Sequence, residues 1–505
     1  MKIINKNRNL KKNAVDTLFS SYFIQFFSKF FSIATQLITA RFFLSLNSYG
    51  TFLYVFFIFS IVNNLRDLGI STQVIRRKEI NYSLINTLFL VLSLIITILQ
   101  IIYGLYILPN NKMFGSTLIL MALSYIPTAL GSAPSIYFAR NLLIKKTITA
   151  RVSSIFLYFV FAVILCYYGF DAAGLAIAKF VQSISFMFMI WLPARKIISV
   201  KIEFDGTLNL IKDSYKFFIN DNLSLITAEI YNYVIKNFVS TASLAIYRAA
   251  HSLIDIPLNI IEQAFFKVAY PLFSQLIDEP KKLINGYTFL TILLLCIEAP
   301  LYAYMFFNSE FIIYLTYGAK YDEAVNIIKL LSFLPIFTPC TTFGIELIKS
   351  LKKDNLMIAY IFIGSFFIIL FSFLLTKNFG ITGTAIANYL GMNYFIIYYF
   401  LYKNYYESFI YIMKRTPIIY IASFGLFFLS HLLKIEFEVI RYIIREIAIF
   451  TQKFSYPIAQ KISDISHKTD IISHSIIDAG LLVIIFYSFY KFIYLPMKKD
   501  LNIRL

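Results

Sequence analysis

The sequence predicts an all-α, polytopic membrane protein with about 14 transmembrane helices, arranged as two six-helix bundles plus two C-terminal helices. Three observations predict this fold class: the composition, long apolar segments, and the placement of positive charge between them. Of the 505 residues, 59% are hydrophobic and 14% are charged, and the mean hydropathy is +0.71. A soluble domain of this length would be far more polar.

The apolar segments are each close to or above the length of about 20 residues that a helix needs to cross the hydrocarbon core. They are continuously apolar rather than alternating, which favours helices over the strands of a barrel. The first segment is too long for a signal peptide, so we expect it to be retained. The predicted spans are 15–42, 49–69, 84–108, 115–139, 147–168, 172–193, 213–238, 241–275, 284–307, 323–348, 355–376, 381–402, 415–433 and 476–495.

Positive charge collects in every second connection between these spans. The alternate connections carry clusters such as Arg76-Arg77-Lys78 and Lys349, Lys352 and Lys353, whereas each intervening connection carries about one cation. By the positive-inside rule, we expect a multi-pass protein of the cytoplasmic (inner) membrane with both termini in the cytoplasm. The formal net charge of +19 then reflects topology and contact with anionic lipid, and no nucleic acid partner is expected.

A weak internal repeat indicates two related halves. The pattern Gly-x-Ala-x-Ala begins at Gly174 and again at Gly383, in the last span of each six-helix block. Small residues at these positions let helices approach closely, and transporters are often built from such repeats around a central site. The predicted organisation is an N-terminal bundle at 1–193, a cytoplasmic linker at 194–212, a second bundle at 213–403, and two extra helices at 404–505 with an amphipathic insertion at 434–475.

Signatures of catalysis and of cofactor binding are missing from the sequence. There is no phosphate-binding glycine-rich loop, no HExxH, no GxSxG and no CxxC. Cys166, Cys296 and Cys340 lie within apolar spans and lack metal-ligand spacing, so we interpret them as small core residues. We therefore expect no enzymatic activity, no cofactor and no metal.

Three polar stripes mark the spans instead. On the first span, polar residues recur at helical spacing, which places Ser21, Gln25, Lys29, Ser32 and Gln36 on one face. Lys29 falls near the middle of the bilayer, where a charge that faces lipid would cost several kcal/mol. It should therefore face an aqueous cavity or pair with a buried acid.

The seventh and eighth spans carry the other two stripes. They comprise Asn222, Glu229, Asn232 and Lys236 on one span and Arg248, His251, Asp255, Asn259 and Glu262 on the next. These faces either line a lumen or form an interhelical salt-bridge network. The acids Asp255, Glu262 and Glu229 are also candidates for coupling transport to protons or sodium ions.

Several short motifs, in order, resemble the Wzx-type flippases, which export O-antigen and capsule repeat units. These flippases belong to the MOP superfamily, together with MATE drug exporters and lipid II flippases. The tyrosine at position 321 replaces the tryptophan usual in the external turn of that family. The matching stretches are 40–43, 49–52, 66–72, 76–79, 245–250, 270–276 and 317–324.

The resemblance implies a flippase that works by alternating access on an oligosaccharide carried by polyprenyl diphosphate. It implies that cations in a central cavity attract the diphosphate and the acidic sugars. The candidate substrate-binding residues are Lys29, Arg41, Arg248, Lys236, Gln25 and Gln36. The expected partners are the lipid-linked oligosaccharide, membrane lipid, and the polysaccharide polymerase with its chain-length machinery.

Two other functions stay open at this point. A multidrug or small-molecule exporter of the same superfamily would favour organic cations and should have a net acidic cavity. A membrane glycosyltransferase or polymerase would need a catalytic acid in an outer connection. The available acids there are Glu310, Asp322, Glu436 and Glu438, which form no recognisable constellation.

Overall fold

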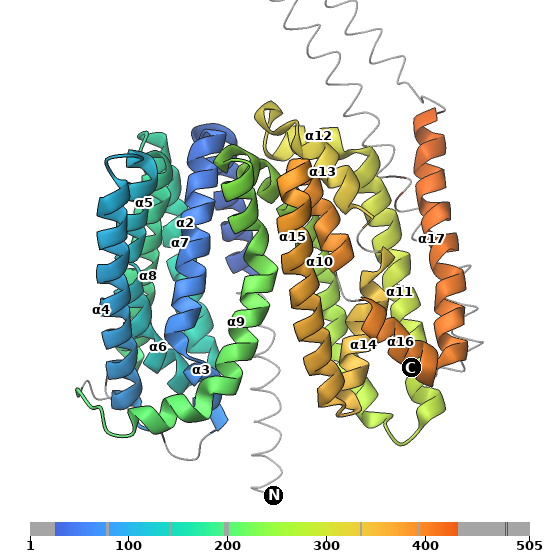
Figure 1. The fold of residues 1–505 in the computed structure, drawn as a ribbon, viewed down its shortest axis with the longest axis horizontal. Coiled ribbons are helices and arrows are strands. Elements are labelled where there is room, and N and C mark those ends of the chain that lie inside the picture. The colour runs from blue at the N-terminus through green and yellow to red at the C-terminus, as the bar shows by residue number, and fades with distance from the viewer. Residues whose placement is uncertain are drawn as a thin grey trace, which may run out of the picture. The chain divides into compact units, whose positions relative to one another are not determined.

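The described residues of the computed structural model are almost entirely helical, and none of them lies in a strand (Figure 1). Eight of their helices are long and apolar enough to cross a membrane. The predicted all-α, polytopic fold class is therefore confirmed. The structure describes residues 26–76, 80–141, 143–195, 201–333, 336–391 and 394–432, with Gly480 and Leu482. Gln25, both chain termini and the 434–475 insertion lie outside these residues.

The chain divides into two compact units, Met1–Ala245 and Ile246–Leu505. The boundary falls near the start of α10 (Thr241–Gln275), a helix of 35 residues. The predicted linker at 194–212 joins two helices of unit 1, and its later part already belongs to α9. Each unit is described by itself below.

Unit 1 begins with a helix over residues 26–38 that continues into the π-helical η1 (Thr39–Phe43). Helices α4, α5, α6, α7 and α8 pack on one another, and α2 contacts α5, α8 and α9 (Figure 1). The remaining helices of this unit are α2 (Leu46–Asp67), α3 (Ile70–Arg76), α4 (Tyr82–Ile107), α5 (Lys112–Ala122), α6 (Tyr125–Arg140), α7 (Ile144–Tyr167), α8 (Asp171–Ala194) and α9 (Thr207–Phe238).

Side-chain caps explain where several helices of unit 1 begin. Asn81 accepts hydrogen bonds from the backbone of Ser83 and Leu84 at 3.1 and 3.2 Å, and Asn111 accepts one from the Phe114 backbone at 3.0 Å. These side chains satisfy N–H groups that have no partner within the first turn of a helix. The predicted span 115–139 is interrupted between α5 and α6.

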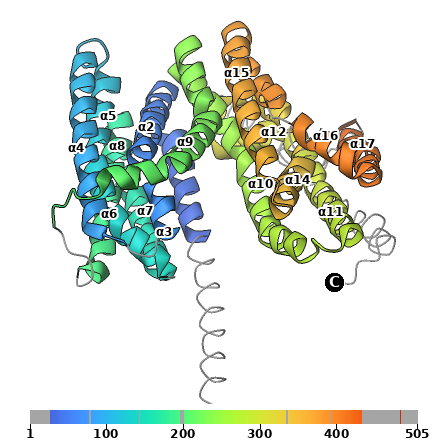
Figure 2. The same ribbon diagram turned by 60° about the horizontal axis from the view of Figure 1, so that its bottom comes forward.

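Unit 2 packs its helices around α11, which contacts α14 and α17. Its core includes fully buried aromatic residues such as Tyr287 and Phe343. Figure 2 shows α14 beside α11 and α16 beside α17. The elements after α10 are α11 (Pro280–Phe307), α12 (Ser309–Thr316), η2 (Ala319–Tyr321), α13 (Ala324–Leu331), α14 (Thr338–Ser350), α15 (Asp354–Gly391), α16 (Tyr394–Asn404) and α17 (Tyr406–Leu432).

The long helix α15 departs from the predicted boundaries. The sequence predicts a break between spans 355–376 and 381–402, and Gly380 does interrupt the helical backbone there with a φ of 60°. Only glycine adopts this left-handed conformation without steric cost. Helical structure resumes at once on the far side of Gly380 and continues to Gly391, where α15 ends before the shorter α16.

Candidate functional site: unpaired cations in unit 1 and buried acids in unit 2

Arg66 directly precedes the turn that joins α2 to α3. Leu68 and Gly69 both adopt left-handed backbone conformations, with φ of 51° and 71°. Asp67 follows Arg66 and caps the next helix, because its Oδ1 accepts hydrogen bonds from the Ser71 backbone at 3.2 Å and the Ser71 hydroxyl at 2.7 Å. Asp67 therefore caps the start of α3, while Arg66 lies on the last turn of α2.

Arg66 is only 4% exposed. Its guanidinium donates hydrogen bonds of 3.3 Å to the hydroxyls of Ser93 on α4 and Ser132 on α6, and it lies 5.3 Å from the centre of the Phe89 ring. Its Nε atom is buried without a hydrogen-bond partner. This environment contains hydroxyls and a ring but does not neutralise the charge. The sequence pattern had grouped Arg66 with the loop cations, whereas the structure buries it.

Lys179 is a second cation inside the helical part of unit 1. It lies on α8, half-buried, and its Nζ lies 5.5 and 5.9 Å from the ring centres of Phe56 and Phe59 on α2. The Nζ also donates a hydrogen bond of 2.8 Å to Gln182. Aromatic faces attract cations and hold them without neutralising them.

Lys236, a predicted substrate-binding residue, has a similar environment on α9. Its Nζ lies 4.9 Å from the ring centre of Tyr54 and 5.6 Å from that of Phe114, and it donates to Asn237 at 3.2 Å. Within the described part of the chain, neither Lys179, Lys236 nor Arg66 forms an ion pair with a carboxylate. Helix α2 supplies a ring or rings to both lysines, and α5 adds Phe114 beside Lys236.

The other predicted cations of unit 1 lie on its first helix. Lys29 is exposed, Gln36 is half-buried, and Gln25 lies outside the described residues. Arg41 is in the π-helical turn η1, half-buried, with its guanidinium 5.3 Å from the Phe42 ring centre. Glu229, on α9, accepts a hydrogen bond from the Asn232 side chain on the same helix.

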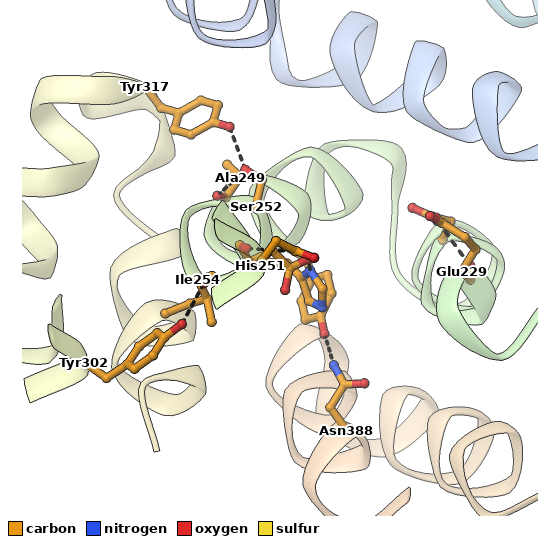
Figure 3. A network of polar contacts seen from close by, with 12 residues as sticks. Glu229, Ala249, His251, Ser252, Ile254, Tyr302, Tyr317 and Asn388 are labelled. Carbon is orange, nitrogen blue, oxygen red and sulfur yellow. Dashed lines mark hydrogen bonds and ion pairs between the residues drawn. The ribbon is translucent and has the colours of Figure 1, made fainter. Parts of the chain in front are cut away.

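In unit 2, α10 is held by side chains from three other parts of the unit (Figure 3). Asn388 of α15 donates a hydrogen bond of 2.6 Å to the buried Tyr247 hydroxyl, and the hydroxyls of Tyr317 and Ser252 share one of 2.9 Å. Tyr302 of α11 donates to the carbonyl of Ile254 at 3.0 Å. These contacts fix the part of α10 that carries the predicted residues Arg248 and Asp255.

The acids of unit 2 lie along α10 and on the facing helices. Oδ2 of Asp255 lies 2.8 Å from Nδ1 of His251, one turn earlier on the same helix. Glu262 accepts a hydrogen bond of 2.9 Å from Thr342 of α14. Arg248 is half-buried on the same helix. The predicted acids Asp255 and Glu262 are therefore in one unit with Arg248.

Glu298 of α11 is an acid that the sequence stripes do not include. Its side chain is fully buried; Oε2 accepts a hydrogen bond of 3.4 Å from Thr338, and Oε1 has no hydrogen-bond partner among the described residues. Thr338 lies one helical turn before Thr342 on α14, so the carboxyls of Glu298 and Glu262 are held by neighbouring positions of one helix. Neighbouring carboxyls repel each other when both are ionised, so this pair favours an added proton or cation.

The signal that would have found the missed residues is a single charge within an apolar span. Lys179 and Glu298 are each isolated in such a run, and a charge there is costly unless it is functional or paired. Arg66 gives no such signal, because Asp67 follows it directly. Helical spacing alone did not select them, because none of them belongs to a polar stripe.

Comparisons with known proteins agree on the class. The fold is similar to that of the lipid II flippase MurJ in an inward closed conformation, with a TM-score of 0.70, 15% identity, and 94% of this chain and 99% of that chain covered. It is also similar to an inward-facing multidrug resistance MATE family transporter of the MOP superfamily, with a TM-score of 0.59, 13% identity, and 78% and 95% of the two chains covered. These likenesses show the fold, which is that of a polytopic, all-α membrane protein.

The particular family follows from the sequence. Residues 38–326 match the model of the polysaccharide biosynthesis protein family, and the chain belongs to that family. No curated protein matches the chain by sequence. The predicted family resemblance is confirmed.

Proposed function

We propose that this protein is a flippase that exports a polyprenyl-diphosphate-linked oligosaccharide across the cytoplasmic membrane for surface polysaccharide biosynthesis. It works by alternating access. Membership in the polysaccharide biosynthesis family supports the pathway, and the flippase-like fold supports the type of step. The proposal places both termini in the cytoplasm and gives the protein a polymerase with chain-length machinery as functional partners.

The observation that carries the proposal is that Arg66, Lys179 and Lys236 of unit 1 form no ion pair with a carboxylate among the described residues. A diphosphate cannot cross hydrocarbon unaided, because an isolated charge there is strongly disfavoured. Lys179 and Lys236 are held over aromatic rings, so their charges remain available for an incoming anion. Lys29, Arg41 and Arg248, with the polar Gln25 and Gln36, complete the proposed substrate-binding set.

The acids of unit 2 have a different role in this proposal. Asp255, Glu262 and Glu298 would bind a proton or a cation in one conformation more tightly than in the other. Such a difference is required, because a ligand shifts a conformational equilibrium only through its differential affinity for the two states. Glu229, on α9, is a further candidate for this coupling.

The first experiment is deletion of the gene, followed by analysis of surface glycan and of lipid-linked intermediates. We expect loss of the glycan with full-length lipid-linked units retained on the cytoplasmic side. Short or unpolymerised units on the outer face would instead indicate an enzyme of assembly, and would contradict the proposal.

Variants then test the cations directly. We expect Lys29→Ala and Arg248→Ala, expressed in the deletion strain, each to lower surface polysaccharide at equal protein level. Lys145→Ala is the control, since Lys145 is an exposed cation in the first turn of α7. Unchanged polysaccharide in both test variants would contradict a role for these cations.

A second candidate function is favoured by the acids of unit 2. An exporter of organic cations would use Glu298, Glu262 and Asp255 to bind its substrate, as the fold shared with MATE transporters allows. Normal surface glycan together with new sensitivity to cationic drugs in the deletion strain would support this function. The unpaired cations of unit 1 disfavour it, because they repel such a substrate.

A further inference from the structure

A groove of about 580 Å³ lies between α15 and α16 in unit 2. Lys353 and Lys403 line one end of it, together with Asn404, and its sides are formed by apolar and aromatic side chains. None of these residues belongs to the proposed substrate-binding set or to the acids of α10 and α11. The proposed substrate binding and ion coupling therefore do not account for this groove.

The two lysines make the end of the groove strongly positive. Lys353 is exposed, and its Nζ lies 4.7 Å from the centre of the Phe400 ring, which is buried beneath it. Lys403 is exposed on the last turn of α16. Neither lysine pairs with a carboxylate in the part of the chain that the structure describes. This end is therefore complementary to an anionic group.

The remainder of the groove is apolar although it is open at the surface. Phe395 is 78% exposed and Tyr399 is 65% exposed, and Ile363 lies on the facing wall. In a protein that spans a membrane, such side chains contact lipid rather than water. The combination of an apolar wall and a positive end matches a molecule with a fatty chain and an anionic head.

Lys353 and Lys403 lie where helices of unit 2 begin and end. Helix α14 ends at Ser350 and α15 begins at Asp354, while α16 ends at Asn404 and α17 begins at Tyr406. The apolar stretch Asn355–Asn404, of 50 residues, is long enough to cross a membrane twice, and Lys353 and Lys403 lie at its two ends. Both lysines are therefore expected at the boundary between hydrocarbon and water. Lysines at that boundary attract anionic lipid.

We propose that this groove binds an anionic phospholipid. The phosphate lies between Lys353 and Lys403, and one acyl chain follows the groove past Phe395 and Tyr399. A soluble anion would gain nothing from the apolar walls, and a zwitterionic phospholipid would bring its own cation beside the two lysines. The proposal does not depend on which substrate the protein transports.

Native mass spectrometry of the full-length protein in detergent tests this proposal, with phosphatidylglycerol and phosphatidylcholine as probes. We expect phosphatidylglycerol to bind preferentially and the preference to weaken with salt. The double variant Lys353→Ala/Lys403→Ala should weaken its binding by roughly 25-fold, since each lysine at a lipid surface contributes about fivefold. Lys377→Ala is the matched control, because Lys377 is also exposed on α15 but lies outside the groove.

A second variant tests the groove without changing its charge. Ala359 lines the wall, so Ala359→Trp should fill the space and weaken phosphatidylglycerol binding while both lysines remain. Equal binding of the two phospholipids, or unchanged binding in the double variant and in Ala359→Trp, would overturn the proposal. Displacement of phosphatidylglycerol by polyprenyl phosphate at equal concentration would also overturn it and assign the groove to the substrate's lipid tail.

Discussion

The two units differ in how they hold charged side chains within their helices. In unit 1, three cations, Arg66, Lys179 and Lys236, lie against aromatic rings, hydroxyls and amides. In unit 2, the fully buried Glu298 and the nearby Glu262 are satisfied only by threonine hydroxyls. Both units are helical, but the cations named in unit 1 lie over aromatic rings, whereas the acids named in unit 2 accept hydrogen bonds from threonines.

This difference between the units indicates where the substrate and the coupling ion of the proposed transporter would bind. A charge without a counter-ion inside a membrane helix costs several kcal/mol, and such residues are kept when they serve function. The partners seen here stabilise each charge only in part, because rings and hydroxyls carry no opposite charge. We infer that unit 1 contributes the site for the anionic substrate and unit 2 the site for the coupling ion.

The largest expected effect is that of Lys179→Met, which removes one of the three cations named in unit 1 but keeps an unbranched side chain of comparable length. We expect transport, measured as surface polysaccharide in the deletion strain, to fall at least about tenfold, as lost charge-assisted contacts of about 1.5–3 kcal/mol imply. Stability should not fall, because an unpaired buried charge opposes folding.

The control for Lys179 is Lys146→Met. Lys146 lies over the Phe138 ring at 5.2 Å, but it is exposed in the first turn of α7. Lys146 therefore contacts an aromatic ring, as Lys179 does, but it does not lie among the packed helices. If the two substitutions had equal effects on transport, or if neither had an effect, the role proposed for Lys179 in unit 1 would be contradicted.

The next effect concerns Glu298→Gln in unit 2, which keeps the shape and removes the ionisable group. We expect transport to lose its dependence on an imposed ion or proton gradient, while the amount of folded protein stays the same or rises. Uptake or flipping by purified protein in vesicles, measured with and without the gradient, checks this prediction.

Glu346→Gln is the matched control for Glu298. Glu346 is also buried in unit 2, but it pairs with Lys349 at 2.6 Å. Its loss should lower stability by leaving a lysine without its partner, and should leave the gradient dependence intact. A Glu298→Gln protein that still responds fully to the gradient would contradict a coupling role for the acids of unit 2.

The smallest expected effect is the loss of stability when alanine replaces the repeated glycines, Gly174 in unit 1 and Gly383 in unit 2. A Cβ on Gly383 would lie 2.1 Å from the Leu375 carbonyl oxygen, whereas one on Gly174 would lie 3.1 Å from the nearest atom, a Phe170 side-chain carbon. We expect Gly383→Ala to destabilise by about 1–3 kcal/mol and Gly174→Ala by less than about 1 kcal/mol. Thermal unfolding of the purified variants in detergent would show the order, and the reverse order would contradict it.

The fold class could be predicted from the sequence because it depends on apolar length and charge placement, which are local properties. The repeat at Gly174 and Gly383 also places buried small residues, since Ala176, Ala178 and Ala385 are fully buried. The boundaries of the helices could be predicted less well than the fold class. The break between α5 and α6 and the continuation of α15 past Gly380 depend on packing that hydropathy does not record.

The candidate site could be predicted only in part. Helical spacing selected Lys236, Asp255 and Glu262, because they lie on faces rich in polar residues. It did not select Lys179, which is the one charge within the apolar body of α8, or Glu298, which has the same place in α11. Which rings and hydroxyls surround a charge depends on helices distant in sequence, and one chain does not reveal those neighbours.

The tyrosine hydroxyl that reaches the backbone of α10 has a mechanical consequence. Pro257 has no N–H, so the carbonyl of Leu253 lacks its usual helical donor, and Tyr302 donates to the adjacent carbonyl of Ile254. This point of α10 is thereby fastened to α11 by a bond of about 1 kcal/mol. Bending α10 here must either carry α11 with it or break that bond, and thermal motion can break and remake a bond of this strength in every transport cycle.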